Sequence, residues 1–259
     1  MRSPFHVLES SPWPFLCSIS SLYIAIGLVD WMNGGSLQFL VFSSVLLSLV
    51  LYQWWRDVVR ESNQGWHTSY VVKGIRLGMM LFIISEVFFF FSFFWAFFSC
   101  SLVPSVEIGG VWPPVGIMPL NPFSLPLLST AVLLGSGVSV TWCHYALMAG
   151  YRKEAIYGLV TTILLGIYFT FLQVSEYMEC VFTIADSVYG SLFYVMTGFH
   201  GVHVIVGTTM LLVMLFRLCN NSFSSERHLG LEISIWYWHF VDAVWIFLYL
   251  CVYWWGGSV

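Results

Sequence analysis

Ionised side chains are scarce in this sequence of 259 residues. Only 8% of the residues carry a charge, whereas about a quarter do so in ordinary soluble domains. A water-facing globule of this composition could not cover its own surface. The few charges form no basic block, and a net charge of −4 excludes nucleic acid as a partner.

Motifs of soluble enzymes are missing as well. The sequence contains no P-loop, no GxSxG and no GxGxxG, and we therefore expect no catalytic residue in this chain. Its six cysteines are scattered without a CxxC pair, which predicts packing thiols instead of a disulfide framework. The first residues, from Met1 to His6, are interrupted by Pro4, so no cleavable leader is predicted.

Long apolar runs dominate what remains, because 59% of the residues are hydrophobic. Seven runs approach or exceed the roughly 17–25 residues that cross a bilayer as a helix. An open strand edge in lipid would leave backbone groups unpaired, so an all-α membrane protein with seven transmembrane helices is predicted. The runs cover residues 15–32, 37–59, 74–103, 125–149, 155–174, 187–216 and 231–255.

The basic residues give an orientation. With seven spans, every Lys and Arg falls on the side of the amino terminus, and none falls on the other side. By the positive-inside rule, the amino terminus lies inside and the carboxyl terminus outside. The inner set is Arg2, Arg56, Arg60, Lys73, Arg76, Arg152, Lys153, Arg217 and Arg227. The outer side receives Asp30, Glu107, Glu176, Glu179 and Asp186.

Few ionisable groups remain at membrane depth, where each is costly. Glu86 lies near the middle of the third run. Its two interpretations are a protonated acid bonded to a neighbouring helix and a carboxyl that serves a proton path or gates a cavity.

Two pairs with a spacing of three residues occupy the last two runs, namely His200 with His203 and His239 with Asp242. On facing helices they could bind zinc, iron or copper. They could equally form an interhelical polar network. His144, near the inner end of the fourth run, is expected at the membrane interface.

Aromatic and charged residues gather at the inner end of the second run. An aromatic belt with snorkelling cations explains them. A docking place for phospholipid headgroups explains them equally well, because guanidinium and imidazolium groups bind phosphate. The residues are Trp54, Trp55, Arg56, Arg60, Glu61 and His67.

Several long motifs resemble subunit III of haem-copper cytochrome c oxidase, of the mitochondrial type. They occur in the order of that family and extend over nearly the whole chain. They are 85–97 (SEVFFFFSFFWAF), 109–122 (GGVWPPVGIMPLNP), 175–177 (SEY), 198–204 (GFHGVHV) and 236–245 (WYWHFVDAVW).

This resemblance implies a fold in which a two-helix unit and a five-helix bundle are separated by a lipid-filled cleft. The implied domains are residues 1–66 and 67–259. Haem a and copper belong to partner subunits in that family, so no metal is expected in this chain. The resemblance also implies a buried carboxyl at Glu86. Because no metal is expected, the interpretation that remains for the two pairs in the last two runs is an interhelical polar network. These residues are His200, His203, His239 and Asp242. Implied headgroup contacts are Trp54, Trp55, Arg56, Arg60, Glu61, His67 and Arg217.

The implied function is that of an accessory core subunit in respiratory complex IV, which transfers electrons from cytochrome c to oxygen and translocates protons. The chain would stabilise subunit I, hold structural phospholipids and support proton uptake. Its expected partners are subunits I and II, small accessory subunits, phospholipids and a respiratory supercomplex. Its expected location is the mitochondrial inner membrane, with the amino terminus in the matrix and the carboxyl terminus in the intermembrane space.

Three other functions are weighed against this one: a retinal protein or receptor, a transporter or channel, and a subunit of a quinol oxidase. A retinal protein needs a lysine within the bundle, and a receptor needs the opposite orientation. A transporter or channel would use Glu86 or Asp242 for its ion, but the inverted repeat typical of many transporters is missing. Quinol oxidases contain a similar subunit, so the cytochrome c donor rests on the resemblance alone.

Overall fold

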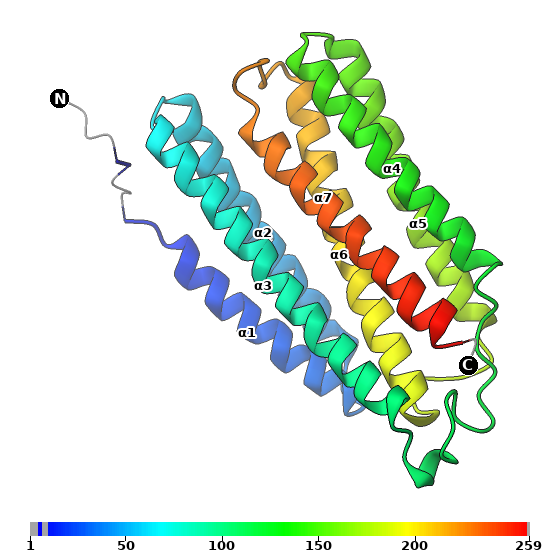
Figure 1. Cartoon of the computed structure of the whole chain (residues 1–259). Helices are drawn as coiled ribbons and strands as arrows, with labels where there is room; N and C mark the ends of the chain where they lie inside the picture. Colours follow the sequence, from blue (N-terminus) through cyan, green and yellow to red (C-terminus); the bar gives the residue numbers. More distant parts are fainter. Residues whose placement is uncertain (1–4, 7–9, 258–259) are drawn as a thin grey trace. The chain divides into compact units, whose positions relative to one another are not determined.

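The computed structural model describes residues 5–6 and 10–257, and within them it contains helices and no strand (Figure 1). Arg2, assigned to the inner side above, lies outside the described residues. Seven helices are long and apolar enough to cross a membrane, which confirms the predicted fold class and number of spans. They are α1 (Trp13–Met32), α2 (Leu37–Asn63), α3 (Ser69–Leu102), α4 (Leu125–Met148), α5 (Arg152–Glu179), α6 (Ser187–Cys219) and α7 (Leu229–Leu248).

Two short elements complete the fold. A 3₁₀ turn, η1 (Val106–Ile108), lies in the link after α3, and a π-helical segment, η2 (Tyr249–Trp255), continues α7. The chain divides into two compact units, residues 1–78 and 79–259. This division falls within the continuous helix α3, whose first residues contact the first unit, as Tyr70 does with Phe5. Each unit is described by itself.

Small residues bring α1 and α2 together in the first unit. Ser20 and Ser43 are buried. A Cβ atom added to Gly27 would lie 3.0 Å from the Cα atom of Leu40. Such close backbone contact is the usual basis of helix association in lipid, where apolar side chains gain little by leaving the acyl chains.

The second unit has its core where α4, α5, α6 and α7 pack in a ring, each against the next and α7 against α4. Trp238 of α7 is fully buried there. Its ring packs directly on Gly166 of α5 and Gly207 of α6. A Cβ atom added to these glycines would lie only 2.7 and 2.9 Å, respectively, from the indole ring. Its Nε1–H donates to Ser136 Oγ of α4 over 2.9 Å. One indole of α7 therefore contacts the other three helices of the ring.

The remainder of α3 contacts this core through aromatic rings. Phe93 stacks on Phe199 of α6 with ring centroids 5.6 Å apart, and Phe90 meets Phe240 of α7 edge-on at 6.2 Å. Phe97, which is fully buried, contacts Trp255 of η2. Large rings between the helices keep the backbone of α3 at a distance, unlike the small residues between α1 and α2.

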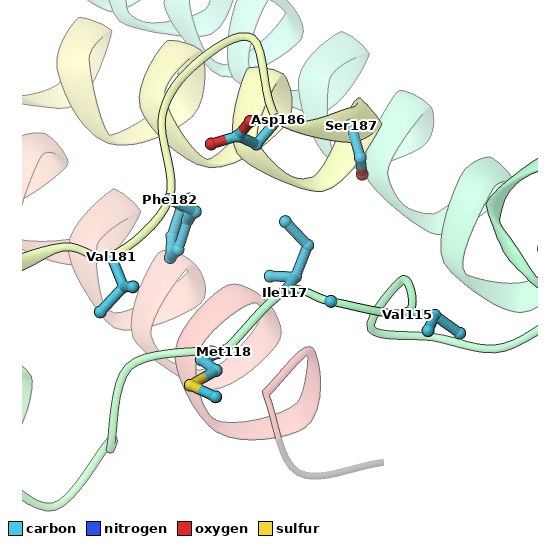
Figure 2. Close-up of a pocket in the computed structure, with 8 residues that line it drawn as sticks. Val115, Ile117, Met118, Val181, Phe182, Asp186 and Ser187 are labelled. Atoms are coloured by element: carbon cyan, nitrogen blue, oxygen red, sulfur yellow. The ribbon is translucent and has the colours of Figure 1, made fainter.

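The links after α3 and α5 enclose a pocket of about 370 Å³ (Figure 2). Figure 2 shows Ile117 and Met118 from the first link opposite Phe182 and Val181 from the second. Two hydrogen bonds from Thr183, the backbone N–H at 2.7 Å and then the hydroxyl at 2.9 Å, hold the pKa of Asp186 below its ordinary value. Asp186 therefore fixes the turn that begins α6.

Candidate lipid-contact and buried polar sites

The residues expected to contact headgroups lie, apart from Arg217, at the end of α2 and in the link that follows it. We call Trp54, Trp55, Arg56, Arg60, Glu61 and His67 the α2-end cluster. Asp57, which the sequence did not single out, organises it. The Asp57 carboxylate accepts from Trp13 Nε1–H over 2.7 Å and from Arg56 Nη2 over 3.1 Å, and Arg60 Nη1 lies 3.7 Å away.

Exposure separates the members of this cluster. The Arg60 side chain is 63% exposed, whereas that of Arg56 is 35% exposed and engaged by Asp57. Trp55 is 54% exposed, and Trp54 is half-buried. An exposed guanidinium next to an exposed indole is able to bind a phosphate and cover the upper part of an acyl chain.

The surroundings of His67 disfavour its charged form. Burial, and then the nearby His6 ring, lower the pKa of His67, and Glu61 only partly opposes them. His6 stacks on Trp66 at 5.3 Å between ring centroids, with its Nε2 atom 3.6 Å from Glu61 Oε2. A lowered pKa favours the neutral ring of His67, so the exposed Arg60 is the stronger source of positive charge in this cluster.

Arg217, the remaining headgroup candidate, is part of the second unit. It lies in the last turn of α6, with its guanidinium 4.6 Å above the centre of the Phe223 ring. The side chain is half-buried, and its Nε atom is buried without a hydrogen-bond partner among the described residues. This cation–π contact leaves Arg217 less available to a phosphate than Arg60.

Glu86 bonds directly to His203. Its Oε2 atom lies 2.8 Å from His203 Nε2, and His203 Nδ1–H donates to the Phe199 carbonyl over 2.6 Å. Because Nδ1 already holds a proton, the contact at Nε2 requires one more, shared between imidazole and carboxyl. The pair is therefore neutral overall, either as acid and imidazole or as carboxylate and imidazolium. This geometry agrees with the interpretation of Glu86 as an acid bonded to a neighbouring helix.

Of the four residues expected in an interhelical polar network, His200, His203 and His239 each make a polar contact with a different helix. Residues three apart on a helix differ by about 60° in direction, which is enough to meet different neighbours within a bundle. His203 faces α3, whereas the buried His200 donates from Nε2 to the Val241 carbonyl of α7 over 3.2 Å. Phe169 and Trp245 flank the His200 ring.

His239 and Asp242 face α4. His239 Nε2 lies 3.3 Å from Thr141 Oγ1, and its Nδ1 is 3.8 Å from Asp242 Oδ2, which is too long for a hydrogen bond. Both residues line an apolar groove of about 670 Å³ between α4 and α7, with Gly137 beside the Asp242 carboxyl. Asp242 Oδ1 is buried there without a partner among the described residues.

Glu176, which the sequence analysis counted on the outer side, is a buried polar residue that the sequence did not single out. The residue lies within α5, and its side chain is buried in the second unit. Its Oε1 atom accepts from Tyr253 Oη–H over 2.5 Å and from Gln173 Nε2–H over 3.3 Å. A signal was present, because Gln173 and Glu176 are one helical turn apart and share a face. The partner from η2 could not be read from the sequence.

The fold and these sites define a multi-pass helical membrane protein with neutralised acids at membrane depth. The family model described as cytochrome c oxidase subunit III matches residues 3–257. The chain belongs to this family, which confirms the resemblance noted in the sequence. It is thus a subunit of cytochrome c oxidase, an oxidoreductase complex, and associates with other subunits of that complex.

Curated relatives agree with the family match. The chain is 59% identical over 257 residues to cytochrome c oxidase subunit 3 of Paracentrotus lividus, covering 99% of this chain and 98% of that protein. It is 58% identical over 254 residues to the protein of the same name from Tetraodon nigroviridis, with coverage of 98% and 97%. For Heterololigo bleekeri the identity is 52% over 258 residues, with coverage of 99% and 100%.

Proposed function

We propose that this chain is an accessory subunit without a redox centre in the complex that transfers electrons from cytochrome c to oxygen and translocates protons. It stabilises catalytic subunit I, holds structural phospholipids and supports proton uptake. The α2-end cluster carries this proposal. There, Asp57 engages Arg56 and Trp13, while the Arg60 guanidinium stays exposed beside an exposed Trp55.

A phospholipid fits the chemistry of this cluster. The planar guanidinium of Arg60 forms paired hydrogen bonds with phosphate oxygens, and the indole of Trp55 packs on the first methylenes of the acyl chains. A neutral His67 adds a hydrogen-bond donor without desolvating a charge. Lipid held in this way fills the apolar surface between this chain and its partner subunits, which stabilises their contact.

The histidines of α6 support the absence of a redox centre. His203 is bonded to Glu86, and His200 donates its Nε2 proton to a backbone carbonyl. Both ring nitrogens of His203 are thus engaged, and His200 keeps only Nδ1 without a partner among the described residues. Haem a and copper are accordingly assigned to subunits I and II.

The inner membrane of the mitochondrion is the proposed location, with the amino terminus in the matrix and the carboxyl terminus in the intermembrane space. The basic residues around the second unit support this orientation. Arg152 and Lys153 begin α5, Arg217 ends α6, and Arg227 precedes α7, so all lie at the same end of consecutive antiparallel helices. Small accessory subunits and a respiratory supercomplex are the further partners proposed.

Removal of the chain from the purified complex tests the proposed function as a whole. Initial oxygen consumption should remain largely intact, because no redox centre is lost. The number of turnovers before inactivation should fall, because lipid and proton supply to subunit I are impaired. An equal loss of both quantities from the first turnover would contradict the proposal.

Lipid binding by the α2-end cluster can be tested separately. In the intact complex, Arg60→Gln should reduce the phospholipid phosphorus that remains after detergent washing. Lys73→Gln, which removes an equal charge from the same unit, is the matched control and should leave the lipid content unchanged. Equal retention of lipid by both variants would show that the α2-end cluster holds no lipid.

A further inference from the structure

Two polar side chains lie in the groove between α4 and α7, where lipid or another subunit must cover them. His239 and Asp242 both line this groove of about 670 Å³. Asp242 stands at the midpoint of the Leu229–Trp255 span, and its side chain is 9% exposed. Its Oδ1 atom is buried without a hydrogen-bond partner among the described residues. Because the bilayer core offers no water, this carboxyl needs a polar partner.

The proton positions of His239 follow from its contact with Thr141. Thr141 Oγ1–H donates to the Gly137 carbonyl over 2.8 Å, so the Thr141 oxygen is left to accept from His239 Nε2–H over 3.3 Å. In the neutral ring, Nδ1 then carries a lone pair, and it lies 3.8 Å from Asp242 Oδ2. This distance is too long for a direct hydrogen bond. An oxygen atom about 2.7–2.8 Å from both would bridge them.

A hydroxyl group has the bonding capacity that this bridging position requires. Its oxygen accepts from the protonated carboxyl of Asp242, and its own proton is donated to His239 Nδ1. No charge is then needed at membrane depth, where charges are costly. A backbone N–H of another transmembrane helix could not take this place, because the backbone groups of such a helix are already paired within it.

The walls of the groove indicate what carries the hydroxyl. A phospholipid presents only hydrocarbon at the bilayer midpoint, and a single water, of about 30 Å³, would leave most of the groove unfilled. A transmembrane helix with one Ser or Thr supplies both the apolar surface and the hydroxyl. The apolar walls that it would contact are formed by Leu134, Val138, Trp142 and Ile246.

Small residues beside the acid leave room for such a helix. Gly137 and Ala243 also line the groove. A Cβ atom added to Gly137 would lie 2.6 Å from Asp242 Oδ2, so a side chain there would take up the space around the carboxyl. Small residues at a helix interface in lipid let the backbones approach closely, which shortens the reach required of a Ser or Thr side chain.

We propose that the groove between α4 and α7 receives a transmembrane helix from a neighbouring subunit of the complex, with a Ser or Thr hydroxyl of that helix bridging Asp242 and His239. The apolar walls hold the helix, and the hydroxyl fixes its depth and rotation, because only one position reaches both polar groups. This contact involves no redox centre and is independent of lipid binding by the α2-end cluster.

Retention of subunits in the purified complex tests the hydrogen bond. Asp242→Leu should weaken the retention of one transmembrane subunit during detergent washing by roughly 3- to 16-fold, the effect of one interhelical hydrogen bond in lipid. Asp242→Asn, whose amide can still bond to a hydroxyl, should retain more of that subunit. Quantitative mass spectrometry of the washed complex would measure both. Equal retention by wild type and Asp242→Leu would refute the bond.

A second variant tests the groove without removing the acid. Val138 is 72% exposed, so Val138→Trp should fill the groove without disturbing the core and should release the same subunit. Leu164→Trp is the matched control, because Leu164 is 59% exposed on α5 and does not line the groove. It should release nothing. Equal release by the two tryptophan variants, or by neither, would contradict docking in this groove.

A density map of the wild-type complex in a lipid nanodisc gives the decisive observation even if Asp242→Leu fails to assemble. A helix of another subunit should lie between α4 and α7, with a hydroxyl oxygen within about 3 Å of both Asp242 and His239. An acyl chain, an ordered water or a second copy of this chain in the groove would overturn the proposal. So would a helix that presents no hydroxyl to Asp242.

Discussion

A carboxyl group within a membrane-spanning helix is stable only when its charge is neutralised or paired. Glu86 meets this condition through His203, whose second nitrogen is fixed by the Phe199 carbonyl. The contact needs only one proton between the two side chains, so neither an isolated carboxylate nor an isolated imidazolium faces the lipid. The same proton also links α3 to α6.

Substitution of Glu86 tests whether the hydrogen bond between Glu86 and His203 stabilises the protein or the two side chains are only in van der Waals contact. Glu86→Gln should be nearly neutral for stability, because the amide can donate to His203 Nε2. Glu86→Leu should cost about 0.6–1.7 kcal/mol, which are the mean and the largest value measured for side-chain hydrogen bonds between membrane helices. Denaturant unfolding of the complex would measure both, with Ser85→Ala as the control on the same turn. Equal costs for Gln and Leu would refute the bond.

The lowered pKa of His67 makes the link after α2 sensitive to pH. The folded state binds the proton less readily than the unfolded state, whose pKa is near 6.5. Stability is therefore fully present above pH 6.5 and is lost as the pH falls from there toward the folded pKa. Hydrogen exchange in residues 64–68 should accelerate over this interval. His67→Asn should abolish that dependence, and a variant that kept the wild-type profile would exclude His67 as its source.

At the scale of single elements, helix ends are fixed by partners from neighbouring helices. Arg152, in the first turn of α5, donates from Nη2 to the Leu218 carbonyl and, over 2.9 Å, to the Cys219 carbonyl. These belong to the last turn of α6, where carbonyl groups lack partners within their own helix. A cation at this end also interacts favourably with the helix dipole.

Loss of this contact should loosen the end of α6. Hydrogen bonds from charged groups contribute about 1.5–3 kcal/mol, and because Arg152 is partly exposed we expect Arg152→Ala to cost about 1–2 kcal/mol. Arg152→Lys should recover part of that loss. Lys153→Ala, next along the chain and exposed, should change the unfolding free energy little. Similar losses at both positions would mean that charge alone, and not the capping bonds, stabilises this end.

The elements themselves were predictable because the bilayer dictates their length and polarity. Each span is an apolar run, and α3 differs from its prediction mainly by an earlier start at Ser69. Side-chain partners were less predictable. Periodicity shows which face of a helix a residue occupies but not which neighbour lies there. Only the packing of the helices shows that Glu176 bonds to Tyr253. It also shows that His200 and His203, on one helix, contact different neighbouring helices.

At the scale of the whole molecule, the orientation rests on the distribution of Lys and Arg and on an odd number of crossings. Only α6 lies between the link at residues 180–186 and Cys219, so these two positions must face opposite compartments. Cys219 is an exposed free thiol, and Val181 in the link after α5 is 79% exposed. Burial raises the pKa of the Cys180 thiol, which keeps its background reactivity low.

Labelling with a membrane-impermeant maleimide would therefore read the orientation directly. In mitoplasts, which expose the outer face of the inner membrane, Val181→Cys should react and Cys219 should not. Inverted inner-membrane vesicles should give the reverse pattern. Detergent-solubilised complex, in which both thiols should react, controls for shielding by partner subunits. Labelling of both positions from one face would overturn the crossing of α6, and a reversed pattern would overturn the assignment of the amino terminus to the matrix.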